Sequence, residues 1–304
     1  MQTRRLFLSA AALAAGAAAF APRLAFAQTG TLARRAIPST GETLPVIGMG
    51  TSGSFQVAAD SAEYTALKEV LKRFFAGGAS LIDTAPTYGN AEPNLGALLA
   101  EQDLRPQCFL ATKLSGVTGR EAGLAQFEAT LKSLRTDRVE LLQVHNLGDW
   151  KTQLALAREL KAQGRVKYVG LTHYVESAQD QLADVMQAEK PDFVQINYSV
   201  TQRGAEKRVL PLAKDLGIAV LTNRNFDDGA LFGKVGDRAV PEWATEAGIT
   251  SWAQLFLKFA LSHEAVTAVI PATGKPDRQS DNLKAGTGPM LDATQRAALI
   301  AQIG

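Results

Sequence analysis

Short apolar runs recur along the chain after residue 45, and more polar segments separate them. The eight runs occupy residues 46–48, 81–82, 109–111, 141–144, 168–171, 193–196, 218–221 and 266–270. Most lie about 25 to 35 residues apart, which is the length of one strand and one crossover helix in a βαβ unit. Continuous apolar runs of this kind are typical of parallel strands that are buried on both faces.

The segments between the runs have the period of amphipathic helices. Residues 67–74 place apolar side chains at i, i+3, i+4 and i+7, and residues 124–134 keep a similar spacing. A third period over residues 154–160 is followed by Gly164, a residue that commonly closes a helix. Strands that alternate with helices predict an α/β fold with a parallel sheet covered by helices. Eight such units favour a closed (β/α)8 TIM barrel over an open sheet.

Residues 31–45 precede the first run, and we expect them to form a hairpin that caps the bottom of the barrel. No linker or run of like charges divides residues 28–304. Barrels of this class commonly form one domain of roughly 250 residues. The sequence therefore predicts one barrel domain over residues 28–304.

The first 27 residues have the layout of an export signal. Arg4 and Arg5 precede Leu-Phe-Leu and an alanine-rich apolar stretch, and Ala-Phe-Ala at residues 25–27 is a small-x-small cleavage signal. The paired arginines followed by x-Phe-Leu resemble the twin-arginine consensus. The alternative is a membrane anchor, but the stretch is too short to span well. We expect residues 1–27 to be a cleaved twin-arginine signal peptide that leaves no stable membrane insertion.

This signal sets the expected destination and the first expected partner. The protein would use the twin-arginine export machinery and become periplasmic or otherwise exported.

The formal net charge of the chain is +2. Without the three arginines of the signal, which contains no acidic residue, it becomes −1. A nearly neutral body lacks the basic patch that a nucleic-acid partner requires. The single cysteine, Cys108, lies in an apolar run, so we expect a buried structural thiol.

Polar residues of chemically useful types stand at the ends of three consecutive predicted strands. Asp83 follows the second run, Lys113 the third and His145 the fourth, and Tyr88 lies in the loop after Asp83. Taken singly, each has a structural explanation, such as a helix cap for the aspartate. Taken together, they converge on the C-terminal face of the barrel, where barrel enzymes keep their active sites. We therefore expect these four residues to form a catalytic group.

The run IDTAPTYG at residues 82–89 resembles the signature of the aldo-keto reductase superfamily. The other matching segments are ATK at 111–113, LQVH at 142–145, GLTH at 170–173, VQINY at 194–198, VIPATGKP at 269–276 and DNL at 281–283. Together with the first strand they cover residues 46 to about 285 in the order of the family. The resemblance implies a TIM barrel that reduces an aldehyde or ketone with NAD(P)H, in a reversible reaction.

Carbonyl reduction requires a hydride for the carbon and a proton for the oxygen. The resemblance implies hydride from C4 of the nicotinamide and the proton from Tyr88. A free phenol has a pKa of about 10, so we expect the Lys113 ammonium to lower the pKa of Tyr88. Asp83 would pair with Lys113, and His145 would orient and polarise the carbonyl oxygen. No metal ion is expected.

The resemblance also implies a set of cofactor contacts. The expected residues are Thr172, His173 and Gln195 at the nicotinamide carboxamide, Asn223 and Arg224 after the seventh strand, and Thr273, Gly274, Lys275, Arg278, Asp281 and Asn282 at the phosphates and adenosine. Pro276 is a good first helical residue, and helix N-termini bind phosphate. Arg278 resembles the position that meets the adenosine 2′-phosphate. NADP(H) is therefore favoured over NAD(H).

The chain departs from the family pattern at three positions. His173 stands where asparagine is usual, and Ala272 stands where a basic residue often follows the proline. Asn223 replaces an aromatic that stacks on the nicotinamide, so Arg224 or Phe226 would have to cover the ring.

The substrate is expected to be a small carbonyl compound, and Trp150, five residues after His145, is the candidate for its pocket. Two other functions stay open at this point. One is a non-catalytic sensor or subunit that binds the nucleotide, against which the intact catalytic group argues. The other is a lyase that forms a Schiff base on Lys113, against which the spacing of Asp83 and Tyr88 argues.

Overall fold

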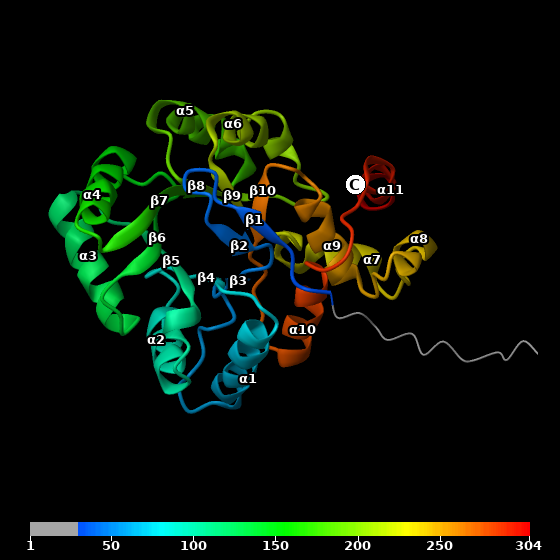
Figure 1. The fold of residues 1–304 in the computed structure, drawn as a ribbon, viewed down its shortest axis with the longest axis horizontal. Coiled ribbons are helices and arrows are strands. Elements are labelled where there is room, and N and C mark those ends of the chain that lie inside the picture. Colours follow the sequence, from blue (N-terminus) through cyan, green and yellow to red (C-terminus); the bar gives the residue numbers. More distant parts are fainter. Residues whose placement is uncertain (1–29) are drawn as a thin grey trace, which may run out of the picture.

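Eight parallel strands form the centre of the molecule, and each strand pairs with its neighbours in chain order. The computed structural model describes residues 30–304 (Figure 1), so the predicted signal peptide at residues 1–27 lies outside the described part. The strands are β3 (Met49–Gly50), β4 (Leu81–Asp83), β5 (Phe109–Leu114), β6 (Val139–His145), β7 (Val166–His173), β8 (Phe193–Asn197), β9 (Ala219–Asn223) and β10 (Val266–Val269). Their parallel order is the one that the apolar runs predicted.

The first and last strands meet and close the ring. Ile47 forms a parallel bridge with Val269, and Gly50 forms another with Ala272. The amide of Gly48 also donates to the carbonyl of Val269 over 2.8 Å. The predicted (β/α)8 TIM barrel is therefore confirmed. The expected position of the first strand, residues 46–48, was wrong, because these residues contact β10 through single bridges and the regular pairing with β4 begins at Met49.

Helices surround the barrel (Figure 1). They are α1 (Ala62–Ala76), α2 (Ala91–Glu101), α3 (Arg120–Ser133), α4 (Trp150–Ala162), α5 (Gln179–Glu189), α6 (Val209–Leu216), α7 (Ala230–Val235), α8 (Glu242–Glu246), α9 (Trp252–Leu261), α10 (Pro276–Lys284) and α11 (Ala293–Ile303), with short 3₁₀ turns η1 (Arg105–Gln107), η2 (Glu176–Ala178), η3 (Gly204–Glu206) and η4 (Asp227–Gly229). Within residues 30–304, no helix is long and apolar enough to cross a membrane.

The region after β9 contains short helices. The segment 227–241 holds η4 and α7. The next two helices, α8 and α9, are separate because Gly248 adopts a left-handed conformation (φ +78°) just after α8. The Ser251 hydroxyl then accepts a hydrogen bond from the Gln254 amide and caps the start of α9.

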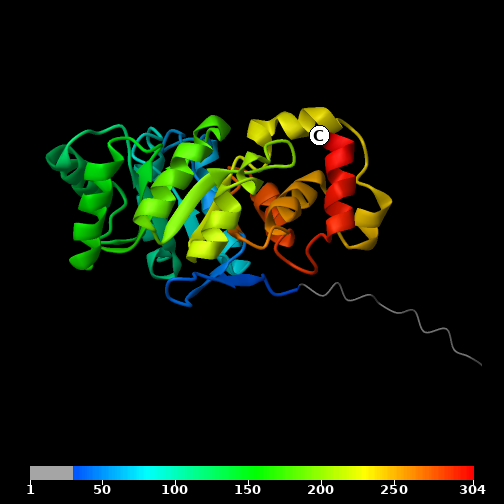
Figure 2. The same ribbon diagram turned by 90° about the horizontal axis from the view of Figure 1, so that it is seen from above.

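A hairpin closes the bottom of the barrel, as predicted for residues 31–45 (Figure 2). Its antiparallel strands are β1 (Arg34–Ala36) and β2 (Thr43–Pro45). Ile37 and Leu44 are buried in one apolar cluster with side chains from the strands above them, including Tyr168 and Phe193. Burial of this cluster removes apolar surface from water and fixes the hairpin under the strands.

The segment Gly48–Gly53 has the G-x-G-x-x-G spacing of a dinucleotide-binding turn. Such a turn requires a helix that begins at the glycines. Here Met49 and Gly50 form β3 itself, and the next helix begins only at Ala62. The spacing is therefore a coincidence of the first strand, and the segment forms no Rossmann turn.

Candidate active site

A buried ion pair lies at the C-terminal ends of β4 and β5. The Lys113 ammonium donates to the Asp83 carboxylate over 2.6 Å and to the carbonyl of Thr84 over 2.8 Å. The exposed fractions of the two side chains are 0% and 4%. Parallel pairing of β4 with β5 places the two strand ends together. The sequence prediction that Asp83 holds Lys113 agrees with this geometry.

Tyr88 and His145 face one another beside this pair. Their ring centres are 6.1 Å apart in an edge-to-face arrangement. The Lys113 Nζ atom lies 5.2 Å from the centre of the Tyr88 ring. The four residues that the sequence grouped are thus gathered in one place, although they come from three strands and a loop.

Both rings are held in their neutral forms. Burial raises the pKa of Tyr88, and the nearby Lys113 ammonium opposes that rise without cancelling it. Lys113 thus lowers the pKa of Tyr88 as expected, but desolvation of the phenolate is the larger effect and leaves the net pKa above its ordinary value. Burial, with smaller effects from Lys113 and His173, lowers the pKa of His145 to about 3. The site thus presents a protonated phenol and a neutral imidazole near neutral pH.

Lys113 keeps its charge. Its burial alone would lower its pKa, but Asp83 and Tyr88 more than offset this and leave the pKa of Lys113 raised. A Schiff base requires a neutral amine as the nucleophile. An ammonium held by a carboxylate is a poor candidate for that chemistry.

Several polar residues of this site were not singled out from the sequence. The Gln143 amide donates to the second oxygen of Asp83 over 3.0 Å. The Ser115 hydroxyl lies 2.5 Å from Nδ1 of His145 and 3.0 Å from the hydroxyl of Thr87. The two-residue period of a strand could have identified two of them, Gln143 and Ser115. Gln143 is two residues before His145 and Ser115 two after Lys113, so each shares a face with its partner.

The predicted carboxamide contacts lie on the neighbouring strands β7 and β8. Thr172 and Gln195 are both nearly fully buried, and the Thr172 hydroxyl donates to the Gln195 carbonyl oxygen over 3.1 Å. The Gln195 Nε2 atom is buried and has no hydrogen-bond partner in residues 30–304. His173 is half-buried at the end of β7, and its Nδ1 accepts the amide of Val175 over 3.2 Å. Burial lowers the pKa of His173.

The loop after β9 brings Arg224 over Tyr174. The guanidinium carbon lies 4.4 Å from the centre of the Tyr174 ring, and a guanidinium nitrogen contacts Asp228 at 2.9 Å. Tyr174 also stacks with His173 at 6.0 Å between ring centres. The Oδ1 atom of Asn223 is buried without a partner in the described part of the chain. Phe226 packs instead against Phe232, at 5.1 Å between ring centres.

The predicted phosphate loop follows β10 and leads into α10. Thr273 is buried, and its hydroxyl accepts the amide of Lys275 over 3.1 Å. Lys275 is the N-cap residue and Pro276 the first residue of α10. Lys275 and Arg278 are exposed, whereas Gly274 is half-buried.

The rest of α10 is tied to the barrel. Both carboxylate oxygens of Asp281 already bind side chains at the start of α9, those of its N-cap residue Ser251 and of Gln254. Asn282 is buried. Gln279, which the sequence analysis did not consider, is fully buried, and neither polar atom of its side chain has a partner within residues 30–304.

Trp150 begins α4 directly after the loop that follows His145. It is half-buried and packs against the main apolar core. Asn146, Leu147 and Asp149 in this loop all have positive φ angles, a conformation that is uncommon for residues other than glycine. The chain therefore turns tightly between His145 and Trp150.

Residues 46–301 match the Aldo/keto reductase family. The chain belongs to this family. The match covers all eight barrel strands and the four residues of the catalytic group.

Two curated relatives of the chain carry reductase names. The chain is 30% identical over 220 residues to "Aldo-keto reductase YhdN" of Bacillus subtilis, a match that covers 66% of this chain and 63% of the relative. It is 27% identical over 233 residues to "Methylglyoxal reductase YeaE" of Escherichia coli, covering 75% of this chain and 80% of that protein. The chain thus spans about two thirds to four fifths of the length of these two relatives.

Solved aldo-keto reductases share the fold. One from Klebsiella pneumoniae, in complex with NADPH, superimposes with a TM-score of 0.73 at 24% identity, covering 86% of this chain and 92% of that one. The holo form of an aldo-keto reductase from Bacillus halodurans gives a TM-score of 0.72 at 19% identity, covering 90% and 97%.

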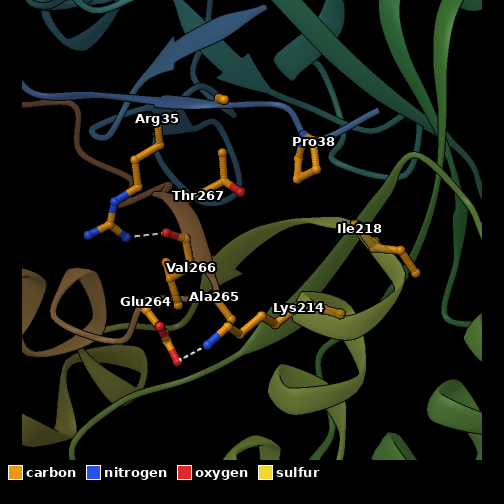
Figure 3. Close-up of a pocket in the computed structure, with 11 residues that line it drawn as sticks. Arg35, Pro38, Lys214, Ile218, Glu264, Ala265, Val266 and Thr267 are labelled. Atoms are coloured by element: carbon orange, nitrogen blue, oxygen red, sulfur yellow. Dashed lines mark hydrogen bonds and ion pairs between the residues drawn. The ribbon is translucent and has the colours of Figure 1, made fainter. Parts of the chain in front are cut away.

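Two cavities of this aldo/keto reductase lie at the bottom of the barrel, away from the catalytic group. One, of about 410 Å³, is bordered by the hairpin, α6 and the start of β10, with Arg35, Lys214 and Glu264 in its wall (Figure 3). The other, of about 690 Å³, lies on the side of the hairpin near Cys108.

Cys108 itself is buried, as expected, and burial raises the pKa of its thiol. Within residues 30–304, no group of His, Cys, Asp and Glu side chains is arranged to hold a metal ion.

Proposed function

We propose that the protein reduces an aldehyde or ketone to an alcohol with NAD(P)H, reversibly. The observation that carries this proposal is the buried Lys113–Asp83 pair beside the facing rings of Tyr88 and His145. A buried lysine is costly unless it is paired, and a structural pair alone would not require a tyrosine and a histidine at its open end.

Each residue of the group has a role in the proposed reaction. Tyr88 gives its phenolic proton to the carbonyl oxygen, and the Lys113 ammonium stabilises the tyrosinate that remains. Asp83 holds that ammonium in place. His145, neutral at working pH, donates a hydrogen bond to the same carbonyl oxygen. The nicotinamide, when bound, supplies the hydride from its C4 atom.

The residues on β7, β8 and β9 fit a nicotinamide carboxamide. The buried Nε2 atom of Gln195 is an unpaired donor, and the buried Oδ1 atom of Asn223 is an unpaired acceptor. Buried polar atoms in native proteins nearly always have partners. A carboxamide offers both an oxygen and an NH₂ group, so it can satisfy these atoms together with Thr172 and His173.

The start of α10 fits the phosphates of the cofactor. The backbone N–H groups of the first helical turn have no partner within the helix, and the helix dipole favours anions at this end. We assign Thr273, Gly274 and Lys275 to the phosphates and Arg278, Asp281 and Asn282 to the adenosine end. Arg278 is exposed on the first turn, where a second phosphate on the ribose would meet it. NADP(H) is accordingly the favoured cofactor.

Arg224 is the residue that takes the place of the usual stacking aromatic. Phe226 is engaged with Phe232 in the core-facing side of its loop. Arg224 instead reaches from the end of β9 to Tyr174 after β7, across the end of β8. A guanidinium plane can stack on a nicotinamide ring. Trp150 is assigned to the substrate side of the same opening, next to His145.

The first experiment is a fluorescence titration of the purified protein with NADPH and, separately, with NADH. We expect saturable binding with NADPH the tighter ligand. Reduction of a panel of aldehydes and ketones would follow, with Tyr88→Phe as the matched variant. Positioned proton donors contribute about 10² to 10⁴ in rate, so Tyr88→Phe should lose at least a hundredfold in kcat and keep its affinity for NADPH.

Each of the other outcomes selects a different function. Failure of both nucleotides to bind would reject the reductase assignment. Binding with no turnover of any carbonyl by the wild type would select the nucleotide sensor. Covalent trapping of a carbonyl compound on Lys113 by borohydride would select the Schiff-base lyase.

We further propose that residues 1–27 direct the folded protein through the twin-arginine machinery, with cofactor loaded before export. The support is the sequence Arg4-Arg5-Leu-Phe-Leu before an apolar stretch and a cleavage signal. Replacement of both arginines by lysine should leave an uncleaved precursor inside the cytoplasm of the native host, as fractionation would show. Mature protein that reaches the exported fraction without nucleotide would contradict the loading step.

A further inference from the structure

Ser115 links His145 to helix α3 and to the loop that carries Tyr88. It is the first residue after β5, two positions beyond Lys113, and only 5% of its surface is exposed. Its hydroxyl lies 2.5 Å from Nδ1 of His145. The Thr87 hydroxyl lies 3.0 Å from the same Ser115 oxygen. The loop that carries Tyr88 therefore contacts His145 through Ser115.

The backbone of Ser115 is fixed by Gln126. The Ser115 amide donates to the Gln126 side-chain oxygen over 2.8 Å, and the Gln126 NH₂ group donates to the Ser115 carbonyl over 2.8 Å. Gln126 lies on α3. A side-chain amide that bonds both backbone groups of one residue leaves that residue little freedom to turn. The contact with Gln126, which lies outside the catalytic group, thus holds the Ser115 hydroxyl against His145.

The state of the His145 ring makes this contact consequential. His145 stays neutral across the physiological range, because burial keeps its pKa at about 3, with Lys113 and His173 as the nearby basic groups. A neutral imidazole has one N–H and one lone pair, and the partner of one nitrogen decides which nitrogen carries the proton. Polarisation of a carbonyl oxygen requires the proton on the nitrogen that faces the substrate.

We propose that Ser115 is a positioning residue that holds His145 as the Nε2–H tautomer. The Ser115 hydroxyl donates to the lone pair of Nδ1, and the Thr87 hydroxyl donates to the Ser115 oxygen. The ring proton then stays on Nε2, which faces the carbonyl oxygen of the substrate. This inference rests on the proposed function for its consequence in catalysis, but the tautomer itself is a property of the protein without substrate.

The test combines a spectroscopic readout with kinetics. The three histidines are labelled with ¹⁵N, and the His145 ring is assigned by its disappearance in His145→Asn. We expect the wild type to show the Nε2–H tautomer. Ser115→Ala should show a mixture of tautomers and a loss of about tenfold in kcat, the size expected from one lost hydrogen bond. Ser115→Thr, which keeps the hydroxyl, should restore both properties.

Two further variants separate positioning from general damage to the fold. Thr87→Val leaves Ser115 in place and removes its donor, so it should give a smaller shift in the same direction. Ser133→Ala, at the end of α3 and away from His145, should change neither readout. An Nδ1–H ring in the wild type, or an unchanged tautomer and kcat in Ser115→Ala, would overturn the proposal. If no carbonyl compound is reduced by any variant, the proposed function fails, while the tautomer spectra still decide the role of Ser115.

Discussion

At the scale of single residues, two different effects set the charge states in the candidate active site. Tyr88 and His145 are neutral because burial disfavours their charged forms. Lys113 is charged because Asp83 lies against it. A donor phenol, a neutral imidazole and a fixed ammonium can therefore coexist within one small volume near neutral pH.

The first residue-scale prediction concerns pH. His145, with a pKa of about 3, should not titrate between pH 5 and pH 9. The pKa of Tyr88 lies above the ordinary value of about 10, so Tyr88 should stay protonated over the same range. We expect kcat/KM for reduction to be flat from pH 5 to pH 9 and to fall only at higher pH. Alcohol oxidation, which uses the tyrosinate as base, should rise with pH throughout. A step near pH 6.5 in the reduction profile would show that a histidine titrates after all.

The second residue-scale prediction concerns the buried ion pair. Asp83→Asn leaves the Lys113 ammonium buried without a carboxylate, which should cost about 3 to 5 kcal/mol in the free energy of unfolding. The control is Glu264→Gln, which breaks an exposed pair with Lys214 at a similar distance of 2.6 Å. We expect the control to leave the urea midpoint nearly unchanged. Equal shifts in the two variants would mean that the Lys113–Asp83 pair is not stabilising.

The gathering of Asp83, Tyr88, Lys113 and His145 could be predicted from the sequence, because the C-terminal ends of consecutive parallel strands meet at one end of a barrel. Their catalytic roles stay a proposal. The net sign of the Tyr88 pKa shift could not be predicted, because it depends on how deeply the phenol is buried, which no local pattern reports. Ser115 and Gln126 were missed for a related reason. Each is an ordinary polar residue, and only the packing of α3 against β5 brings them to His145.

At the scale of elements, α2 fixes the strand that carries Lys113. Glu92 on α2 is buried and accepts hydrogen bonds from Thr112 on β5 over 2.7 Å and from Thr130 on α3 over 3.1 Å. Thr112 and Lys113 are adjacent in β5, so their side chains point to opposite faces of the strand. The outer face of β5 is thereby bonded to α2, and Glu92 joins α2 in turn to α3, while the inner face of β5 carries Lys113.

This arrangement requires close contact between α2 and α3, which gives an element-scale prediction. A Cβ atom on Gly96 of α2 would lie 2.3 Å from the Ser133 carbonyl oxygen. Gly96→Ala should therefore force the helices apart, at a cost of about 1 to 3 kcal/mol. The matched control is Gly233→Ala on α7, where nothing lies within 4 Å of the added carbon. That control should stabilise the protein slightly, by about 0.5 to 1 kcal/mol, because glycine is a poor helix former. Urea denaturation measures both, and a stable Gly96→Ala would show that α2 and α3 can move.

Elements with strong periodicity were predicted well, and those defined by tertiary contacts were not. The strands from β4 to β10 follow the apolar runs closely. The two-residue β3 could not be located from its run, because its length is set by which neighbours it pairs with. α7 is short and follows residues with positive φ angles, so its period is too brief to distinguish it from a loop.

At the scale of the whole molecule, the two ends of the barrel differ in structure. The C-terminal ends of the strands carry the proposed catalytic group, and the hairpin closes the N-terminal ends (Figure 2). Arg35 of the hairpin donates to the carbonyl of Leu261 over 2.5 Å and to the carbonyl of Val266. It therefore joins β1 to the end of α9 and to the start of β10. Figure 3 shows the bond to Val266.

The whole-molecule prediction compares two neighbouring arginines. Arg35→Gln removes charge-assisted bonds to several carbonyls and should lower the free energy of unfolding by about 1.5 to 3 kcal/mol. Arg34→Gln is the control, because among residues 30–304 the Arg34 guanidinium bonds to Thr43 of the same hairpin and to no other residue. Both variants should keep the kcat of the wild type, since they lie at the opposite end from Tyr88. A loss of kcat in folded Arg35→Gln would reveal coupling between the two ends of the barrel.

The bonds of Arg35 also impose an order of events on the newly made chain. The partners of Arg35 lie more than 220 residues further along the sequence, so the hairpin that is synthesised first can be fastened only after the last strand exists. Contacts of such long range form late in folding. The predicted export signal ends a few residues before this hairpin. The hairpin is therefore attached only in a completely folded barrel. It also lies next to the predicted signal, which is the segment that an export machinery for folded proteins would bind.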